Sequence, residues 1–109
     1  MIASLTTEAI LQIHADVIEN SGGSLGVRDL NLVHSAVQRM HASAFGIDLY
    51  TTIWQKAAAL FHSLVKNHGF VDGNKRTATI SLETFLDLNK SDRKQPKDKL
   101  LEDFVLLVA

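Results

Sequence analysis

The strongest constraint on this chain is a helical spacing of apolar residues that proline interrupts only once. Pro96 is the single proline among 109 residues, and proline breaks helix interiors because it lacks an N–H donor. Apolar residues recur at intervals of three and four along most of the sequence, which is the period of an amphipathic helix. The pattern predicts an all-α fold, a compact helical bundle of about five helices.

Start and stop signals place the boundaries of these helices. Thr6, Asp29 and Thr51 or Thr52 are good N-cap residues, and the glycine-rich segment 21–26 ends the first helix. The expected helices span approximately residues 7–20, 30–40, 53–68, 74–89 and 100–108. Residues 41–50 show no sustained period, so this segment is expected to be a loop that contains at most a small hairpin.

Composition narrows the class of protein. A chain of 109 residues fits one domain, predicted here to span residues 1–109. The net charge of −1 argues against direct nucleic-acid binding, which needs an excess of lysine and arginine. No apolar run approaches the ~20 residues that span a bilayer, the N-terminus does not resemble a signal peptide, and the absence of cysteine fits a reducing compartment. We therefore expect a cytoplasmic protein with no membrane segment.

The turn between the third and fourth predicted helices is unusually rich in reactive side chains. The nine residues His68-Gly69-Phe70-Val71-Asp72-Gly73-Asn74-Lys75-Arg76 include a histidine, a carboxylate, an amide and two cations. A helix that begins near Asn74 exposes the N–H groups of its first turn, so residues 72–76 are expected to form an anion site. Lys75 and Arg76 add positive charge that suits phosphate oxygens.

The remaining members of the cluster suggest phosphate chemistry. Asp72 offers the hard oxygen ligand that Mg²⁺ prefers, and His68 can accept a proton from an attacking hydroxyl near neutral pH. Phe70 is expected to turn inward and anchor the loop to the core. On residue types alone, a solvated turn with a capping aspartate explains the cluster about equally well, so the order and spacing have to decide.

That order resembles the signature His-x-Phe-x-(Asp/Glu)-Gly-Asn-x-Arg of the Fic superfamily. Within it, the chain most resembles the death-on-curing (Doc) toxins of toxin–antitoxin pairs, with agreement from Leu5 to Ala109. The resemblance implies the Fic/Doc helical fold, ATP as substrate and Mg²⁺ as cofactor. It also implies a cognate antitoxin and a protein substrate, elongation factor Tu.

The resemblance assigns roles to individual residues. His68 would be the general base, Asp72 the Mg²⁺ ligand, and Gly73, Asn74 and Arg76 phosphate contacts. The target-docking flap of the family would correspond to roughly residues 41–50, where a target segment could add as a strand. Lys66 would match a basic residue that lies near the phosphates.

Two departures bear on which group is transferred. Members of the superfamily that transfer AMP have glycine where this chain has Lys75, and a second arginine where it has Thr79. The Doc-like members share the lysine, bind the nucleotide in the inverted orientation and transfer its terminal phosphate. A toxin-type protein phosphotransferase is therefore expected, with Lys75 and Arg76 joining His68 and Asp72 in catalysis. AMP transfer and a catalytically silent, partner-binding member remain as alternatives.

Further expectations concern single residues and the C-terminus. His14 falls on the apolar stripe of the first helix and is expected to be a core histidine bonded to a backbone carbonyl. Trp54 lies beside the stripe of the third helix and is expected to be partly buried. The toxins usually continue through one more helix than this chain, so a truncated product or a partner that covers the apolar end is expected.

Overall fold

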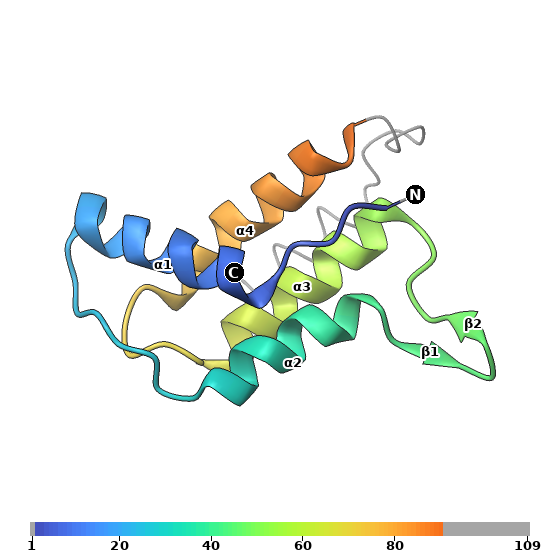
Figure 1. Cartoon of the computed structure of the whole chain (residues 1–109), viewed down its shortest axis with the longest axis horizontal. Helices are drawn as coiled ribbons and strands as arrows, with labels where there is room; N and C mark the ends of the chain where they lie inside the picture. Colours follow the sequence, from blue (N-terminus) through green and yellow to red (C-terminus); the bar gives the residue numbers. More distant parts are fainter. Residues whose placement is uncertain (1, 91–109) are drawn as a thin grey trace.

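The computed structural model describes residues 2–90, which form four α-helices and one short hairpin (Figure 1). The elements in chain order are α1 (Thr7–Ser21), α2 (Leu30–Met40), β1 (Ser43–Ala44), β2 (Ile47–Asp48), α3 (Ile53–Asn67) and α4 (Asn74–Leu88). This arrangement confirms the all-α prediction and four of the five expected helices. The expected helix at 100–108 lies outside the described residues.

Each of the first three helices begins at a side chain that caps it. The Thr6 hydroxyl accepts a hydrogen bond from the Ala9 N–H at 3.1 Å, and the Asp29 carboxylate accepts one from the Asn31 N–H at 3.0 Å. Thr52 caps α3 by accepting from the Gln55 N–H. These bonds satisfy N–H groups that have no partner inside the helix.

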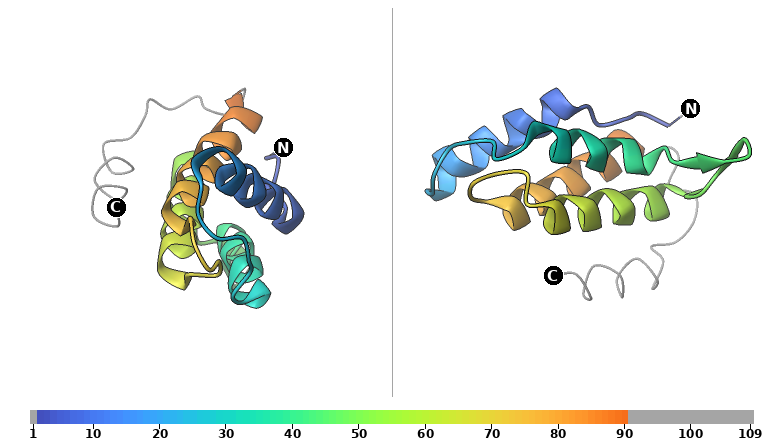
Figure 2. Two further views of the ribbon diagram at one scale, coloured as in Figure 1. Left: turned by 90° about the vertical axis from the view of Figure 1, so that its left-hand side faces the viewer. Right: turned by 90° about the horizontal axis from the view of Figure 1, so that it is seen from below.

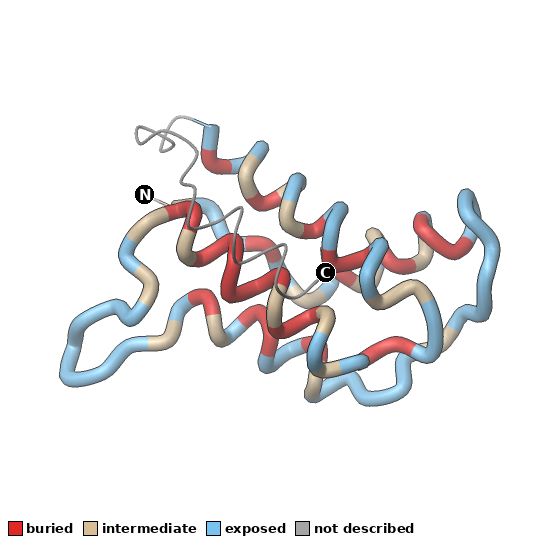
Figure 3. Tube along the Cα trace, turned by 180° about the vertical axis from the view of Figure 1, so that it is seen from behind, coloured by how far each residue is buried: buried red, intermediate tan, exposed pale blue. Residues whose placement is uncertain are grey.

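The core lies around α3, which packs against α4 on one side and α2 on the other, while α1 packs against α4 (Figure 2). The buried face of each helix points toward this centre (Figure 3). Partial burial of Trp54 was the expectation and is wrong, because Trp54 is only 7% exposed and packs with Ala58 and with Leu86 of α4. None of the helices within residues 2–90 has the length and apolar character that a membrane crossing requires.

The hairpin expected within residues 41–50 is present, but it lies at the opposite end of the molecule from the α3–α4 turn (Figures 1 and 2). β1 and β2 pair antiparallel, and Phe45 and Gly46 form the tip with positive φ angles of 55° and 77°. The buried Lys56 ammonium holds the chain where it enters the hairpin, because it donates a hydrogen bond to the Met40 carbonyl oxygen at 3.1 Å. The same ammonium lies 3.7 Å from the Asp48 carboxylate.

Candidate active site

The turn between α3 and α4 opens into a pocket of about 940 Å³. Its lining comprises Val17, Ser21, Gly22, Gly23, His68, Val71, Asp72, Gly73, Asn74, Lys75, Arg76, Thr79 and Ile80. The structure thus brings together all the candidate residues of the nine-residue cluster. Lys66 is not part of this lining; it is exposed on the last turn of α3. A pocket of this size falls within the range that holds small-molecule ligands.

His68 is the residue at which α3 ends, and its backbone is left-handed. Its φ and ψ are 49° and 51°, a conformation that costs roughly 1–2 kcal/mol for a residue with a Cβ. The exposed side chain faces the pocket. The tight reversal that follows lets the chain leave α3 and reach the start of α4 within six residues, so the candidate base His68 and the start of α4 share one turn.

Arg28 holds the end of α3 and was missed by the sequence analysis. Its guanidinium donates through Nε to the His68 carbonyl oxygen at 2.6 Å and through a terminal nitrogen to the Asn67 carbonyl oxygen at 2.9 Å. The last carbonyls of a helix lack intrahelical partners and carry the negative end of its dipole, so a cation is favourable there. Because the contact spans 40 residues, no local sequence pattern signals it.

The segment from Gly23 to Asp29 runs antiparallel to the turn and pairs with it. The backbone N–H groups of Arg28 and Asp29 both donate to the Gly69 carbonyl oxygen, at 2.8 and 3.0 Å. An isolated bridge joins Val27 to Phe70, and the Val71 N–H donates to the Gly26 carbonyl oxygen. The connection between α1 and α2 therefore forms one wall of the site.

The Asp72 carboxylate is fixed at the pocket by two backbone donors. One oxygen accepts from the Ser24 N–H at 3.1 Å and the other from the Gly73 N–H at 2.8 Å. These two bonds, in that order, are the main reasons why the pKa of Asp72 is lowered, and the positive charge of Arg76 adds to them. The exposed carboxylate is therefore ionised at neutral pH.

A glycine leaves room for this carboxylate. A Cβ on Gly23 would lie 2.6 Å from an oxygen of Asp72, closer than such atoms approach. Each oxygen accepts one backbone bond and keeps lone-pair capacity for another partner. An ionised, exposed carboxylate with spare acceptor sites is what Mg²⁺ uses when it binds together with phosphates, so Asp72 fits the metal-ligand role expected of it. No cluster of three or more potential ligands occurs within residues 2–90.

Beneath the turn, His14 of α1 supports it from the core. His14 is 3% exposed, and its Nε2 donates to the Asp72 carbonyl oxygen at 2.8 Å. Its ring stacks on Phe70 with centroids 3.9 Å apart and planes 7° from parallel. The expectations of a core histidine bonded to a carbonyl and of an inward-facing phenylalanine, itself 3% exposed, are both confirmed.

The Asn74 side chain closes the loop on itself. Its amide oxygen accepts from the Phe70 N–H at 3.0 Å, and its amide nitrogen donates to the Phe70 carbonyl oxygen at 2.9 Å. The family resemblance assigns a phosphate contact to Asn74. In the structure both the oxygen and the nitrogen of its carboxamide are hydrogen-bonded to the main chain of Phe70. Asn74 thus shapes the site through its side chain, and its main chain begins the helix.

The N-terminus of α4 faces the pocket and has no side-chain cap, unlike those of the other three helices. Gly73 precedes it with φ 74°, the left-handed conformation that its lack of a Cβ permits. Lys75 and Arg76 are exposed on its first turn, and the Thr79 hydroxyl donates to the Lys75 carbonyl oxygen one turn later. The helix dipole and two cations thus make this end of the pocket electropositive, as the expected anion site requires.

The hairpin to which the resemblance assigns target docking does not line the pocket. The hairpin is separated from His68 by the full length of α3, which is about 22 Å at 1.5 Å per residue. The segment that does lie beside His68 is 23–29, whose Leu25 and Val27 are 69% and 44% exposed. The family resemblance places target docking at residues 41–50, whereas the fold brings the α1–α2 connection to the site.

Comparisons with known proteins agree on one family. The family model described as Fic/DOC family matches residues 4–86. Toxin Doc of Mycolicibacterium smegmatis (strain ATCC 700084 / mc(2)155) is 53% identical over 68 residues, which are 62% of this chain and 52% of that protein. The chain thus spans about half the length of the curated relative that it matches. No solved structure matches the chain.

Proposed function

This chain belongs to the Fic/DOC family, and from that premise we propose that it is a toxin-type phosphotransferase. It moves the γ-phosphate of ATP to a hydroxyl of a target protein, for which elongation factor Tu is the first candidate. A cognate antitoxin restrains it, and it acts in the cytoplasm. The similarity to a protein named Toxin Doc supports this proposal.

The observation that carries the choice of phosphate transfer is the position of Lys75 and Thr79. Both line the pocket one helical turn apart, on the N-terminal part of α4. An AMP-transferring site needs a glycine and a second arginine there, to hold the β- and γ-phosphates deep in the pocket. Lys75 stands at the position of that glycine and lines the pocket, and Thr79 supplies no guanidinium, so the terminal phosphate is favoured next to His68.

His68 accepts the proton of the target hydroxyl while the oxygen of that hydroxyl attacks the γ-phosphorus. The bond from that phosphorus to the bridging oxygen breaks, and ADP leaves with the electron pair. Arg76, Lys75 and the first-turn N–H groups of α4 stabilise the charge on the phosphate oxygens. Asp72 would hold Mg²⁺, which would neutralise phosphate charge when bound. The target approaches along segment 23–29, which contacts the His68 carbonyl oxygen through Arg28 and carries the exposed Leu25 and Val27.

Labelled nucleotide separates the candidate reactions. The purified chain is incubated with elongation factor Tu and ATP labelled at either the α- or the γ-phosphate. We expect label on the target from γ-labelled ATP only. Label from α-labelled ATP would show AMP transfer, and label from neither would favour a silent, partner-binding member.

A variant series tests the role of Lys75. Lys75→Gly should lower phosphate transfer at least tenfold, because losing a charged hydrogen bond costs about 1.5–3 kcal/mol. Lys75→Gly combined with Thr79→Arg should begin to transfer AMP. Lys90→Ala is the matched control, since Lys90 lies just beyond the C-terminal end of α4, remote from the pocket, and pairs with Asp87. Equal activity of Lys75→Gly and the unmutated chain would contradict the assignment.

A further inference from the structure

We propose that His14 is a positioning residue of the active site, which sets the orientation of the Asp72 carboxylate by holding the Asp72 main chain. The proposal extends the proposed function, because it concerns the support of the same turn, but it rests on contacts of the chain itself. His14 lies 58 residues before Asp72, on a different helix. It does not line the pocket.

The hydrogen bond of His14 has one direction only. A carbonyl oxygen can accept but not donate, so the Nε2 of His14 that lies 2.8 Å from the Asp72 oxygen must carry a hydrogen. His14 is 3% exposed, and its hydrogen bond to the Asp72 carbonyl oxygen is partly buried. Removing this donor takes a hydrogen bond from a partly desolvated carbonyl group, which costs free energy.

The stacking contact fixes where that donor points. The imidazole lies 3.9 Å above the Phe70 ring and nearly parallel to it, and Phe70 belongs to the same turn as Asp72. His14 therefore contacts the turn twice, once at its apolar anchor and once at the peptide group of the carboxylate residue. Together, the stacking contact and the hydrogen bond fix the position and the orientation of the turn relative to α1.

The Asp72 peptide group links His14 to the carboxylate. The Asp72 carbonyl bonded to His14 and the Gly73 N–H bonded to the carboxylate belong to the same peptide plane. Because a peptide unit is planar, rotating its carbonyl away from His14 also rotates its N–H away from the carboxylate. The Ser24 N–H would then hold the side chain alone. Loss of the His14 bond should thus loosen the carboxylate without any change to the pocket residues.

Substitutions at position 14 separate the two contacts. His14→Phe keeps an aromatic ring to stack on Phe70 but removes the donor, whereas His14→Gln restores an N–H donor at a similar reach. Amide hydrogen exchange is measured at Gly73 and Ser24, the two donors to the carboxylate. We expect exchange at both to rise at least tenfold in His14→Phe and to return most of the way in His14→Gln.

Ile10→Val is the matched control, because Ile10 is fully buried on the same helix and lies one turn away on the same face. It should lower the melting temperature. Amide exchange at Gly73 and Ser24 should rise no more than the exchange of core amides that report global unfolding. Phosphotransfer is measured in parallel, where His14→Phe should lower kcat at least tenfold with recovery in His14→Gln. Unchanged exchange in a folded His14→Phe protein would overturn the proposal.

A measurement on the unmutated chain keeps the test decisive if His14→Phe fails to fold. The nitrogen chemical shifts of the His14 ring identify which nitrogen carries hydrogen, and a hydrogen on Nε2 is required. A ring with hydrogen on Nδ1 alone would overturn the proposal. If the chain transfers no phosphate but exchange responds as expected, the proposed function fails while the positioning role stands. Full phosphotransfer with unchanged exchange in His14→Phe would remove the positioning role and leave the proposed function in place.

Discussion

At the scale of single residues, the site combines the exposed imidazole proposed as the base with a strained backbone. The His68 side chain lies in solvent, while its main chain adopts the left-handed conformation and its carbonyl oxygen accepts from Arg28. Little packing depends on the imidazole, so its removal should affect chemistry far more than folding. The backbone strain, by contrast, depends only on the presence of a Cβ.

Two substitutions at His68 should therefore give equal loss of activity and unequal stability. His68→Ala and His68→Gly both remove the base, which costs roughly 10²–10⁴-fold in rate. His68→Gly should be about 1 kcal/mol more stable than His68→Ala, since glycine accepts the left-handed conformation without a Cβ penalty. Urea unfolding and phosphotransfer assays measure the two effects. A folded His68→Ala protein with full activity would contradict the role as base.

The adjacent glycines 22 and 23 provide a matched pair for Asp72. Both have positive φ angles, of 82° and 114°, so alanine is strained at either position. A Cβ at Gly22 would meet nothing within 4 Å, whereas a Cβ at Gly23 would collide with the Asp72 carboxylate. We expect similar melting temperatures for Gly22→Ala and Gly23→Ala, with at least tenfold lower kcat in Gly23→Ala alone, in line with the loss of a charged hydrogen bond of about 1.5–3 kcal/mol. Equal kcat values would argue against a role for this spacing.

At the scale of elements, helix starts could be predicted from the sequence and the support of the turn could not. The caps Thr6, Asp29 and Thr52 bond within two or three residues of themselves, so residue type and order suffice to find the first two and to narrow the third to Thr51 or Thr52. The contacts of Arg28 and His14 with the turn span 40 and 58 residues. Which residues meet in such long-range contacts depends on how the helices pack against one another, and the local spacing of apolar residues does not specify that packing.

The C-terminal end of α3 offers a test of this long-range support. Arg28→Ala removes the donor to the carbonyl oxygens of Asn67 and His68, which should cost about 1–2 kcal/mol of unfolding free energy. Because one of these carbonyls belongs to His68, kcat should also fall, and Arg28→Lys should recover stability more than activity. Calorimetry and steady-state kinetics report the two quantities. Loss of stability with unchanged kcat would limit Arg28 to a structural role.

At the scale of the whole molecule, stability should respond to pH through a cluster remote from the pocket. The pKa of His62 is lowered, first by burial and then by the positive charges of Arg39 and Lys66. Arg39 donates to His62, Ser63 and Tyr50, and so links α2, α3 and the end of the hairpin. A protonated His62 could not accept the bond from Arg39.

The sign of the pH effect follows from the lowered pKa. The unfolded chain takes up a proton at His62 near pH 6.5 while the folded chain does so only at lower pH, so the unfolded state binds more protons between these values. Stability is therefore full above about pH 6.5 and is lost as pH falls toward the folded pKa. We expect the denaturant midpoint to fall from pH 7 to pH 5, and to fall less in His62→Asn. An equal fall in both proteins would place the titrating group elsewhere.

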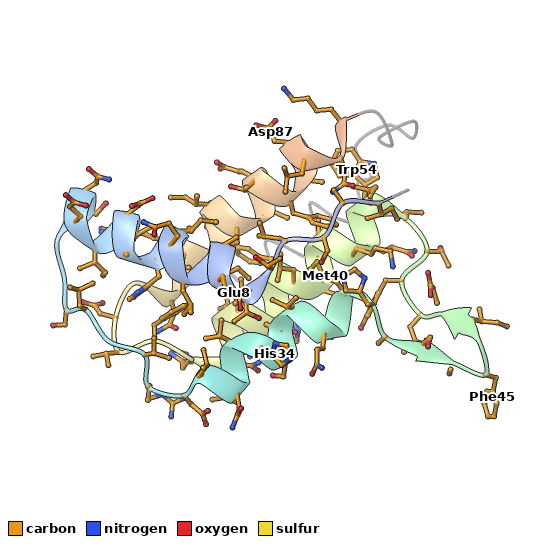
Figure 4. All side chains as sticks on the ribbon, viewed as in Figure 1. Glu8, His34, Met40, Phe45, Trp54 and Asp87 are labelled. Atoms are coloured by element: carbon orange, nitrogen blue, oxygen red, sulfur yellow. The ribbon has the colours of Figure 1, made fainter. Side chains whose placement is uncertain are left out.

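The opposite placement of hairpin and active site has a practical consequence. Phe45 is fully exposed at the hairpin tip, and its ring points away from the body of the molecule (Figure 4). Because the sequence contains no cysteine, Phe45→Cys would give the chain a single thiol, located where no pocket residue is near. A fluorophore attached there would report on tumbling or on capture by another protein, and a surface linker would immobilise the chain, while the pocket at the other end stays accessible.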